Sequence, residues 1–170
     1  LGLEINRPNQ VWVSDITYIG KREKPCYLSL VTDAYSKKIM GYYVANNMNT
    51  ESSVKALNMA IKQRKNNETP LIHHSDRGIQ YCSEEYVSLL NKHDILISMT
   101  EKGDPLENSI AERLNGIIKG EYLNQQSYKS IKELKASLSN VVSFYNNERP
   151  HFSCGMLVPA CAADLTAPPR

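Results

Sequence analysis

Residues 73–83 have the sequence HHSDRGIQYCS and place Asp76 at the end of an apolar run that is typical of a buried strand. The simplest interpretation is a turn, because an aspartate at a strand end accepts hydrogen bonds from the backbone two residues on, and Gly78 suits the next turn position. A second interpretation is a functional carboxylate, because α/β folds gather their chemistry at strand ends. The choice depends on whether other carboxylates join Asp76.

The composition is that of one globular domain of 170 residues, 41% hydrophobic and 22% charged. Without an apolar run of about 18 residues or a signal segment, we expect a soluble, cytoplasmic protein with no membrane partner. The net charge of +2 attracts nucleic acid only weakly, so a DNA partner would need a local basic patch. The chain begins without methionine, which suggests a piece of something longer.

The four cysteines are scattered and form no C-x-x-C pair, which favours reduced, packed thiols over disulfides. The chain also has four histidines, but no closely spaced cysteine pair faces a closely spaced histidine pair. A structural zinc site is therefore not expected.

The spacing of β-branched and aromatic residues predicts three consecutive strands, followed by alternating helices and strands. We expect Thr50 and Ser83 to cap two of the helices. The predicted strands cover 11–20, 26–35, 38–46, 70–74 and 95–99, and the predicted helices cover 50–64, 84–93, 105–122 and 130–147. This order indicates an α/β fold with a mixed sheet flanked by helices, with a core domain over 1–150 and a mostly irregular extension over 151–170.

Asp15 lies in the middle of the first predicted strand, between apolar residues such as Val13 and Ile16. A charged group in so apolar a strand is unfavourable unless it is paired, hydrogen-bonded or bound to a metal. Asp15 is therefore a second candidate for a functional carboxylate.

A third candidate comes from the predicted helix 105–122, whose apolar residues form one stripe. The stripe consists of Leu114, Ile117 and Ile118. Glu112 and Lys119 fall on the opposite side of the helix, with Asn115 beside them. Glu107 falls near the apolar side or in the first turn, where a carboxylate more often serves the helix N-terminus. Glu112 is the better candidate, although a solvated helix face is the simpler interpretation of Glu112 and Lys119.

The spacing and flanks of these carboxylates resemble those of one family. Between Asp15 and Asp76 lie 60 residues, and between Asp76 and Glu112 lie 35. The chain resembles the catalytic core of the retroviral-integrase superfamily, in particular the bacterial insertion-sequence transposases of the IS-three group. The matching motifs are VWVSDITYI (11–19), HHSDRGIQYCS (73–83), SMTEKGDPLENSIAERLNGIIKGE (98–121) and FYNNERPH (144–151).

The resemblance implies a ribonuclease-H-like five-stranded mixed sheet and a catalytic triad of Asp15, Asp76 and Glu112. It also implies two Mg²⁺ ions, replaceable by Mn²⁺, held by the same three carboxylates. The implied activity is cleavage and strand transfer of DNA, with transposon ends and target DNA as partners and a homo-oligomer as the working form. A helix-turn-helix region for end recognition is expected upstream and is absent from this chain.

Around the triad, Lys119 is expected to contact phosphate, and Asn115, Arg77 and His74 are further candidates for DNA contact. His74 is equally a candidate for a packed strand-end histidine, and Arg77 for a brace of its turn. We interpret Asp33 as a strand-end turn residue. The closing-motif residues are interpreted as structural: Asn146, Arg149 and His151.

Two alternative functions remain open on the sequence alone. One is a ribonuclease-H-like nuclease that hydrolyses DNA without strand transfer, since the triad is common to both activities. The other is a decayed copy that binds DNA or self-associates without catalysis.

Overall fold

The computed structural model describes residues 3–20, 25–64, 69–100 and 109–165. The strands are β1 (Val11–Ile19), β2 (Cys26–Asp33), β3 (Ile39–Ala45), β4 (Leu71–Ser75) and β5 (Ile95–Met99). The helices are α1 (Thr50–Gln63), α2 (Glu84–Lys92), α3 (Ser109–Ile117), α4 (Ile131–Asn147) and α5 (Pro159–Ala163). A π-helical turn, η2 (Ile118–Leu123), continues α3, and a 3-10 turn, η3 (Phe152–Cys154), precedes α5.

The strands form one five-stranded mixed sheet in the order β3-β2-β1-β4-β5. β1 pairs antiparallel with β2, and β2 pairs antiparallel with β3. On its other side β1 pairs parallel with β4, which pairs parallel with β5. The predicted mixed sheet, antiparallel first and parallel afterwards, is confirmed. β1 is therefore the central strand, and the pairing of Val13 with His74 places the end of β4 beside the middle of β1.

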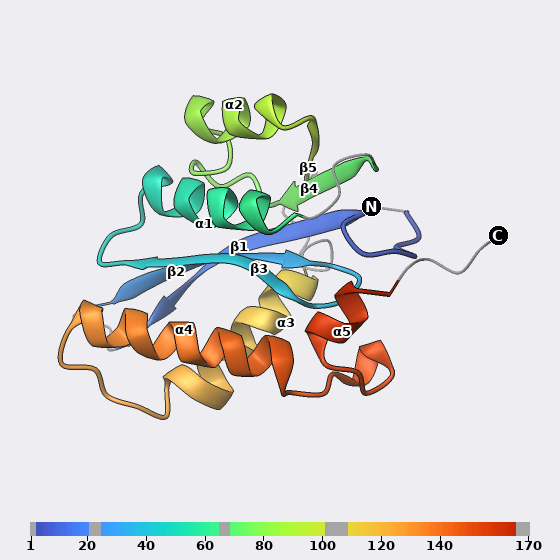
Figure 1. Cartoon of the computed structure of the whole chain (residues 1–170). Coiled ribbons are helices and arrows are strands. Elements are labelled where there is room, and N and C mark those ends of the chain that lie inside the picture. The colour runs from blue at the N-terminus through green and yellow to red at the C-terminus, as the bar shows by residue number, and fades with distance from the viewer. Residues whose placement is uncertain (1–2, 21–24, 65–68, 101–108, 166–170) are drawn as a thin grey trace.

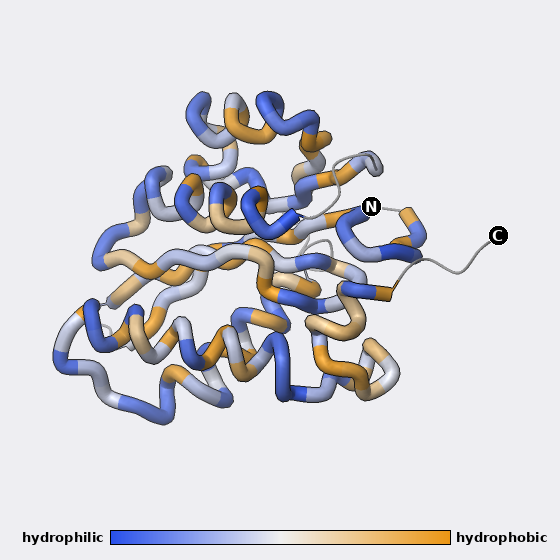
Figure 2. Tube along the Cα trace, in the orientation of Figure 1, coloured by the Kyte–Doolittle hydropathy of each residue, from blue (hydrophilic) through white to orange (hydrophobic). Residues whose placement is uncertain are grey.

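Helices cover both faces of the sheet, α1 and α2 on one side and α3, η2 and α4 on the other (Figure 1). Trp12 packs in a buried cluster with Leu57 of α1 and Tyr86 of α2. Ile19 packs on the opposite face, in a cluster with residues of η2 and α4. Apolar and polar positions alternate along the elements (Figure 2), as expected where amphipathic helices and strands share two cores.

α1 lies directly against β3 at Gly41. A Cβ atom added there would collide with the backbone oxygen of Ala56 and would lie 2.8 Å from the backbone nitrogen of Ala60. Only a residue without a side chain permits this approach, because both obstacles are backbone atoms that cannot rotate away.

The predicted helix caps are right in one case and wrong by one residue in the other. Ser83 caps α2, and its side chain accepts from the backbone N–H of Tyr86. α1 is capped by Asn49, whose side chain accepts from Ser52, while Thr50 is the first residue of the helix. Asparagine is at least as good a cap as threonine, so the helix starts after the stronger acceptor.

The predicted helix 130–147 is confirmed as α4, whereas the helix before it is divided differently from the prediction. The predicted helix 105–122 corresponds to α3 and η2, and its first residues, Glu107 included, lie outside the described part of the chain. The segment 151–170, predicted to be mostly irregular, includes η3 and α5 in its described part, and α5 packs against α4. None of the described helices combines the length and apolar character that crossing a membrane requires.

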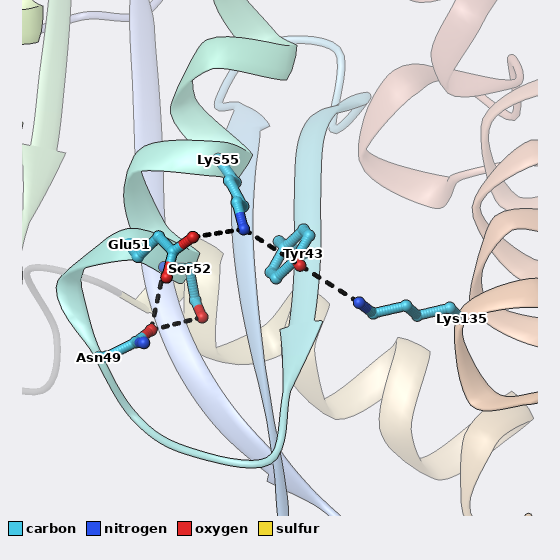
Figure 3. A network of polar contacts seen from close by, with 6 residues as sticks. All are labelled: Tyr43, Asn49, Glu51, Ser52, Lys55 and Lys135. Atoms are coloured by element: carbon cyan, nitrogen blue, oxygen red, sulfur yellow. Dashed lines mark hydrogen bonds and ion pairs between the residues drawn. The ribbon is translucent and has the colours of Figure 1, made fainter. Parts of the chain in front are cut away.

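A tyrosine on edge strand β3 links the two helix layers. The Tyr43 hydroxyl accepts hydrogen bonds from Lys135 of α4 at 3.2 Å and from Lys55 of α1 at 3.4 Å (Figure 3). Both ammonium groups also lie over the Tyr43 ring. The hydrogen bond from Lys135, followed by that from Lys55, lowers the pKa of Tyr43.

Candidate active site

Asp15 lies half-buried on the central strand and is held by an amide from a distant helix. Asn115 of α3 donates from Nδ2 to Asp15 Oδ2 at 2.7 Å. Burial raises the pKa of Asp15 above 3.8, and the hydrogen bonds from Asn115 and the Ile16 backbone oppose that shift. The charges of Asp76 and Glu112 raise it further. Asp15 is thus a poorly solvated carboxylate within the electrostatic reach of the other two.

Asp76 directly follows β4, and the parallel register that pairs Val13 with His74 places Asp76 level with Asp15 in the middle of β1. Its Oδ1 accepts from the backbone N–H of Gly78 at 2.8 Å, so it forms the predicted aspartate turn. The side chain is exposed to solvent. Asp76 therefore forms its own turn and also lies level with Asp15 on the neighbouring strand, where its charge raises the pKa of Asp15.

Glu112 lies in the first turn of α3 with its side chain exposed, opposite the buried Leu114, as the helical periodicity predicts. Asn115, predicted on that same solvated side, is instead buried and only 4% exposed. The difference arises because Asn115 faces Asp15 across the packed interface between α3 and β1. Helical periodicity alone does not reveal that a polar side of a helix rests on a neighbouring strand.

The three candidate carboxylates therefore come from β1, from the end of β4 and from the start of α3. In the described parts of the chain, no three His, Cys, Asp or Glu side chains gather closely enough to hold a metal ion. The charges of Asp76 and Glu112 raise the pKa of Asp15. The distances between the three carboxylates are, however, larger than in a closed metal site. The donor set nevertheless consists of the hard oxygen ligands that Mg²⁺ prefers.

Lys119 of η2 lies beside the end of β1, with Nζ 3.4 Å from the centre of the Tyr18 ring. A groove of about 1130 Å³ opens at this point, and its lining includes Tyr18, Lys119 and Lys129. The residues that line the groove include none of the three candidate carboxylates. Its cationic and aromatic side chains form the kind of surface that suits a phosphate chain.

His74 and Arg77 both make contacts within the fold. His74 is buried on β4, and its Nδ1 is hydrogen-bonded to Ser98 Oγ of β5 at 2.9 Å. Arg77 is exposed and donates from Nε to the backbone oxygen of Thr100 at 2.8 Å. The contact of His74 is the kind that a packed histidine at a strand end makes. The contact of Arg77 ties the turn after β4 to the residue that follows β5.

Three of the residues interpreted as structural make side-chain contacts within the fold: Asp33, Asn146 and Arg149. Asp33 accepts from the backbone N–H groups of Asn9 and Ser36, each at 2.9 Å, and from Ser36 Oγ at 2.5 Å. Asn146 pairs with the backbone of Ile39 through both its amide atoms, at 2.9 and 3.0 Å. Arg149 forms a two-pronged ion pair with Glu121 at 2.8 and 2.9 Å.

Sequence reasoning missed Tyr81, which is five residues beyond Asp76. Its side chain is buried, and its pKa is raised well above 10.0 by burial first, then by Tyr86, Asp15 and Asp76. An aromatic residue in this position suggests only core packing, because a sequence does not show where a phenol oxygen points. The sequence feature that could have drawn attention to Tyr81 is its position within the stretch 73–83.

A matching family model and a set of relatives identify the class of protein. The integrase core domain model matches residues 5–105, and a second integrase core domain model matches residues 93–159. A protein of insertion element IS600 from Shigella sonnei is 35% identical over 90% of this chain and 56% of its own length. The transposase of insertion sequence IS629 from Shigella sonnei is 34% identical over 84% of this chain and 48% of its own length.

The solved structures agree on the fold. A chain in the structure of a simian T-cell lymphotropic virus intasome in complex with PP2A regulatory subunit B56 gamma matches 99% of this chain and 59% of its own length, with a TM-score of 0.81 at 19% identity. The HTLV-2 integrase catalytic core, solved with magnesium, matches 92% of this chain and 97% of its own, with a TM-score of 0.72 at 19% identity. The fold is thus the ribonuclease-H-like fold of retroviral integrase cores.

The chain belongs to the integrase core domain family, and an insertion-sequence transposase is among the relatives to which it is similar. The chain spans about half the length of the curated relatives it matches.

Proposed function

We propose that this chain is the catalytic core of a DNA transposase that cuts and joins DNA strands with divalent metal ions bound to Asp15, Asp76 and Glu112. The environment of Asp15 is the observation that carries the proposal. A half-buried carboxylate on a central strand, with two further carboxylates acting on it, is unfavourable for the fold by itself. A bound cation would relieve both the desolvation and the repulsion.

The chemistry of the donor set favours Mg²⁺, with Mn²⁺ as a substitute. Carboxylate oxygens are hard ligands, and Mg²⁺ keeps several waters and uses substrate phosphate to complete its shell, so a closed protein cage is not required. Two bound ions would activate the attacking oxygen and stabilise charge on the phosphate and on the leaving 3′ oxygen. The magnesium in the HTLV-2 integrase core, a structural neighbour, supports this choice of ion.

The surrounding side chains have distinct proposed roles. Asn115 fixes the rotation of the Asp15 carboxylate through its hydrogen bond to Oδ2. Lys119, at the border of the groove, would contact a phosphate of the bound strand. Arg77 and His74 lie at the end of β4 beside Asp76 and are proposed, with Asn115, as further DNA contacts.

The proposed reaction has two steps at one site: a hydrolysis that leaves a 5′ phosphate on the other fragment, and then a transesterification in which a 3′ oxygen of the target strand leaves. Water attacks a phosphodiester at an element end and frees a 3′ hydroxyl, which then attacks a phosphodiester of the target DNA. Joining needs two DNA ends held together, so we propose a homo-oligomer as the working form. The dimeric and trimeric forms in which the HTLV-2 core was solved support this part of the proposal.

The test is incubation of the protein with Mg²⁺ or Mn²⁺ and a labelled duplex that carries the ends of the element encoding it. Joined products support the transposase, and shortened products without joining support the nuclease. The absence of both, in protein that is folded and binds DNA, supports a decayed core and overturns the proposal.

Single substitutions of the carboxylates sharpen this test. Asp15→Asn, Asp76→Asn and Glu112→Gln should each abolish both products. The matched control is Glu84→Gln, because Glu84 is also an exposed glutamate in the first turn of a helix, α2. If Glu112→Gln and Glu84→Gln retain equal activity, Glu112 is a solvated surface residue.

A further inference from the structure

The groove beside Lys119 combines cationic, amide and aromatic side chains above a buried apolar layer. It lies between the end of β1, the turn η2 and the start of α4. Its lining residues Ile19, Leu123 and Leu134 are at most 3% exposed and belong to the core beneath it. Among the described residues that line it, none is Asp or Glu. The groove is therefore complementary to an anionic chain.

Local hydrogen bonds fix both cationic sides of the groove. In η2, the backbone N–H of Asn124 donates to the backbone oxygen of Lys119, five residues back, at 2.8 Å. Such π-helical turns are rare and occur frequently at functional sites. At the start of α4, Glu133 Oε2 accepts from the backbone N–H of Lys129 at 2.8 Å, and Ser130 Oγ accepts from that of Glu133 at 3.2 Å. This arrangement fixes the backbone at Lys129 and engages the Glu133 carboxylate.

Two elements connect the groove to the candidate carboxylates. β4 pairs with β1 at Val11–Val13, so the edge of β1 beyond Val13 is not covered by β4. Tyr18 lies three residues beyond Asp15 on β1, about 10 Å at the rise of a strand. Lys119 lies seven residues beyond Glu112, also about 10 Å at the rise of a helix. By either element, the groove begins about three nucleotides along one DNA strand from a candidate carboxylate.

The exposed ring of Tyr18 favours a single strand over a duplex as the occupant. Tyr18 is 54% exposed, although Lys119 Nζ lies 3.4 Å from the centre of its ring. Bases stack on aromatic side chains when they are unpaired, because in a duplex their faces are covered by neighbouring bases. A positively charged groove with an exposed ring is typical of a site for single-stranded DNA.

We propose that this groove binds the unpaired continuation of the DNA strand that is cut at the carboxylates. Lys119 and Lys129 contact its phosphates, and a base stacks on Tyr18. The inference rests on the proposed function and adds to it a site for single-stranded DNA outside the three carboxylates. It implies that the protein prefers DNA whose end beyond the scissile phosphate is unpaired.

Binding of a labelled oligothymidine without metal tests the groove independently of catalysis. An oligomer of about ten nucleotides is within the range of single-strand sites. Lys129→Ala should reduce the slope of log K against log salt by about 0.7 unit, the value for one phosphate contact with a single strand. Lys92→Ala, which removes an exposed charge from α2, is the matched control and should leave the slope unchanged. Equal slopes for the two variants would overturn the assignment.

Two substitutions of Tyr18 test the stacking of a base. Tyr18→Leu should weaken binding of the oligothymidine by at least about fivefold, the lower end for the loss of one stacked base. Tyr18→Phe keeps the ring face and should bind like the wild type. Because Tyr18 is more than half exposed, both variants should fold, and their melting curves check this. Equal affinities of the two variants would show that no base stacks on this ring.

A duplex with an unpaired flank beyond the scissile phosphate should be compared with a blunt duplex of the same sequence. Wild-type protein should bind the flanked duplex more tightly and cut it faster. Lys129→Ala should lose this advantage and keep the wild-type affinity for the blunt duplex. If Lys129→Ala weakened binding to both duplexes equally, the groove would hold double-stranded DNA and the proposal would be wrong.

The failures of the two proposals are distinguishable. If wild-type protein cuts and joins DNA, but Lys129→Ala and Tyr18→Leu bind the oligothymidine as the wild type does, the groove assignment is wrong and the transposase proposal stands. If folded wild-type protein neither cuts nor joins DNA, the proposed function fails. Weaker binding of the oligothymidine by the same two variants would then still support a single strand in the groove.

Discussion

One half-buried and one buried aspartate show how the same residue type serves opposite purposes. Asp33 receives three hydrogen bonds, two from Ser36 and one from Asn9, 24 positions away, and these oppose the effect of burial on its pKa. Asp15 receives one side-chain hydrogen bond, from a residue 100 positions away, and faces two other carboxylates. A compensated carboxylate stabilises structure, whereas a poorly compensated one is available to a ligand.

Asp15→Asn should separate these roles. Burial raises the pKa of Asp15, so its ionised form weakens the fold at neutral pH, and the uncharged amide should melt at or above the wild-type temperature without metal. Wild-type protein should gain about 1.4 kcal/mol from Mn²⁺ at tenfold above Kd, and the variant much less. Thermal melting with and without Mn²⁺ measures both.

Asp33→Asn is the control for this experiment. It should lower the melting temperature, because one carboxylate oxygen that accepts from the Ser36 backbone and hydroxyl would become an amide nitrogen that cannot accept. Its gain from Mn²⁺ should equal that of the wild type. If Asp15→Asn behaved like Asp33→Asn, Asp15 would be a structural strand residue.

His73 gives the fold a defined sensitivity to acid. It lies buried between Ser14 and Tyr86, and burial lowers its pKa from 6.5 to about 3. Below pH 6.5, His73 binds a proton in the unfolded chain but stays neutral in the folded protein. The free energy of unfolding should therefore fall as the pH falls. The contribution is about 1.4 kcal/mol for each pH unit well below 6.5.

His73→Gln removes this proton and isolates the effect. Urea unfolding at pH 7.5, 5.5 and 4.5 should show that the wild type loses more stability than the variant as the pH falls. The other titrating groups affect both proteins alike. A stability difference that does not change with pH would contradict a neutral, buried His73.

At the scale of elements, the order and type of strands and helices follow from the sequence because their patterns are local. Alternation and β-branched residues mark β1 to β5, and helical spacing marks α1, α2 and α4. Helical periodicity correctly predicts that Glu112 of α3 is exposed but wrongly predicts that Asn115 is exposed. The reason is that the periodicity of one helix contains no information about β1. The site depends on which strand a polar helix face meets, and that is a property of the assembled sheet.

The contact between α1 and β3 predicts that alanine substitutions at two glycines change the stability of the fold in opposite directions. Gly41→Ala should destabilise the fold by about 3 kcal/mol, since the added methyl meets backbone atoms of Ala56 and Ala60. Gly116→Ala, in α3, meets nothing within 4 Å and should stabilise by up to about 1 kcal/mol through helix propensity. Chemical denaturation of both variants checks the pair, and equal effects would mean that α1 does not rest on Gly41.

At the scale of the whole molecule, charge sets the expected mode of DNA binding. The net charge is only +2, so we expect weak binding with little sequence preference and a steep dependence on salt. Lys119→Ala should weaken binding to all sequences alike and flatten the plot of log K against log salt by about one unit.

Lys62→Ala, which removes an exposed charge from the last turn of α1 in the other helix layer, is the control and should leave the slope unchanged. Fluorescence anisotropy over a salt series measures both variants. Loss of discrimination between sequences, with an unchanged slope for Lys119→Ala, would show that Lys119 reads bases.

The hydrogen bond between Asn115 and Asp15 also orders events during synthesis. β1 leaves the ribosome early, yet its aspartate acquires its amide partner only after residue 115 has emerged and α3 has docked. A nascent chain therefore carries Asp15 and Asp76 for some time without Glu112 or Asn115. Incomplete chains, whether stalled or prematurely terminated before α3, lack the arrangement that we assign to DNA cutting, so we expect the proposed activity to require synthesis through α3.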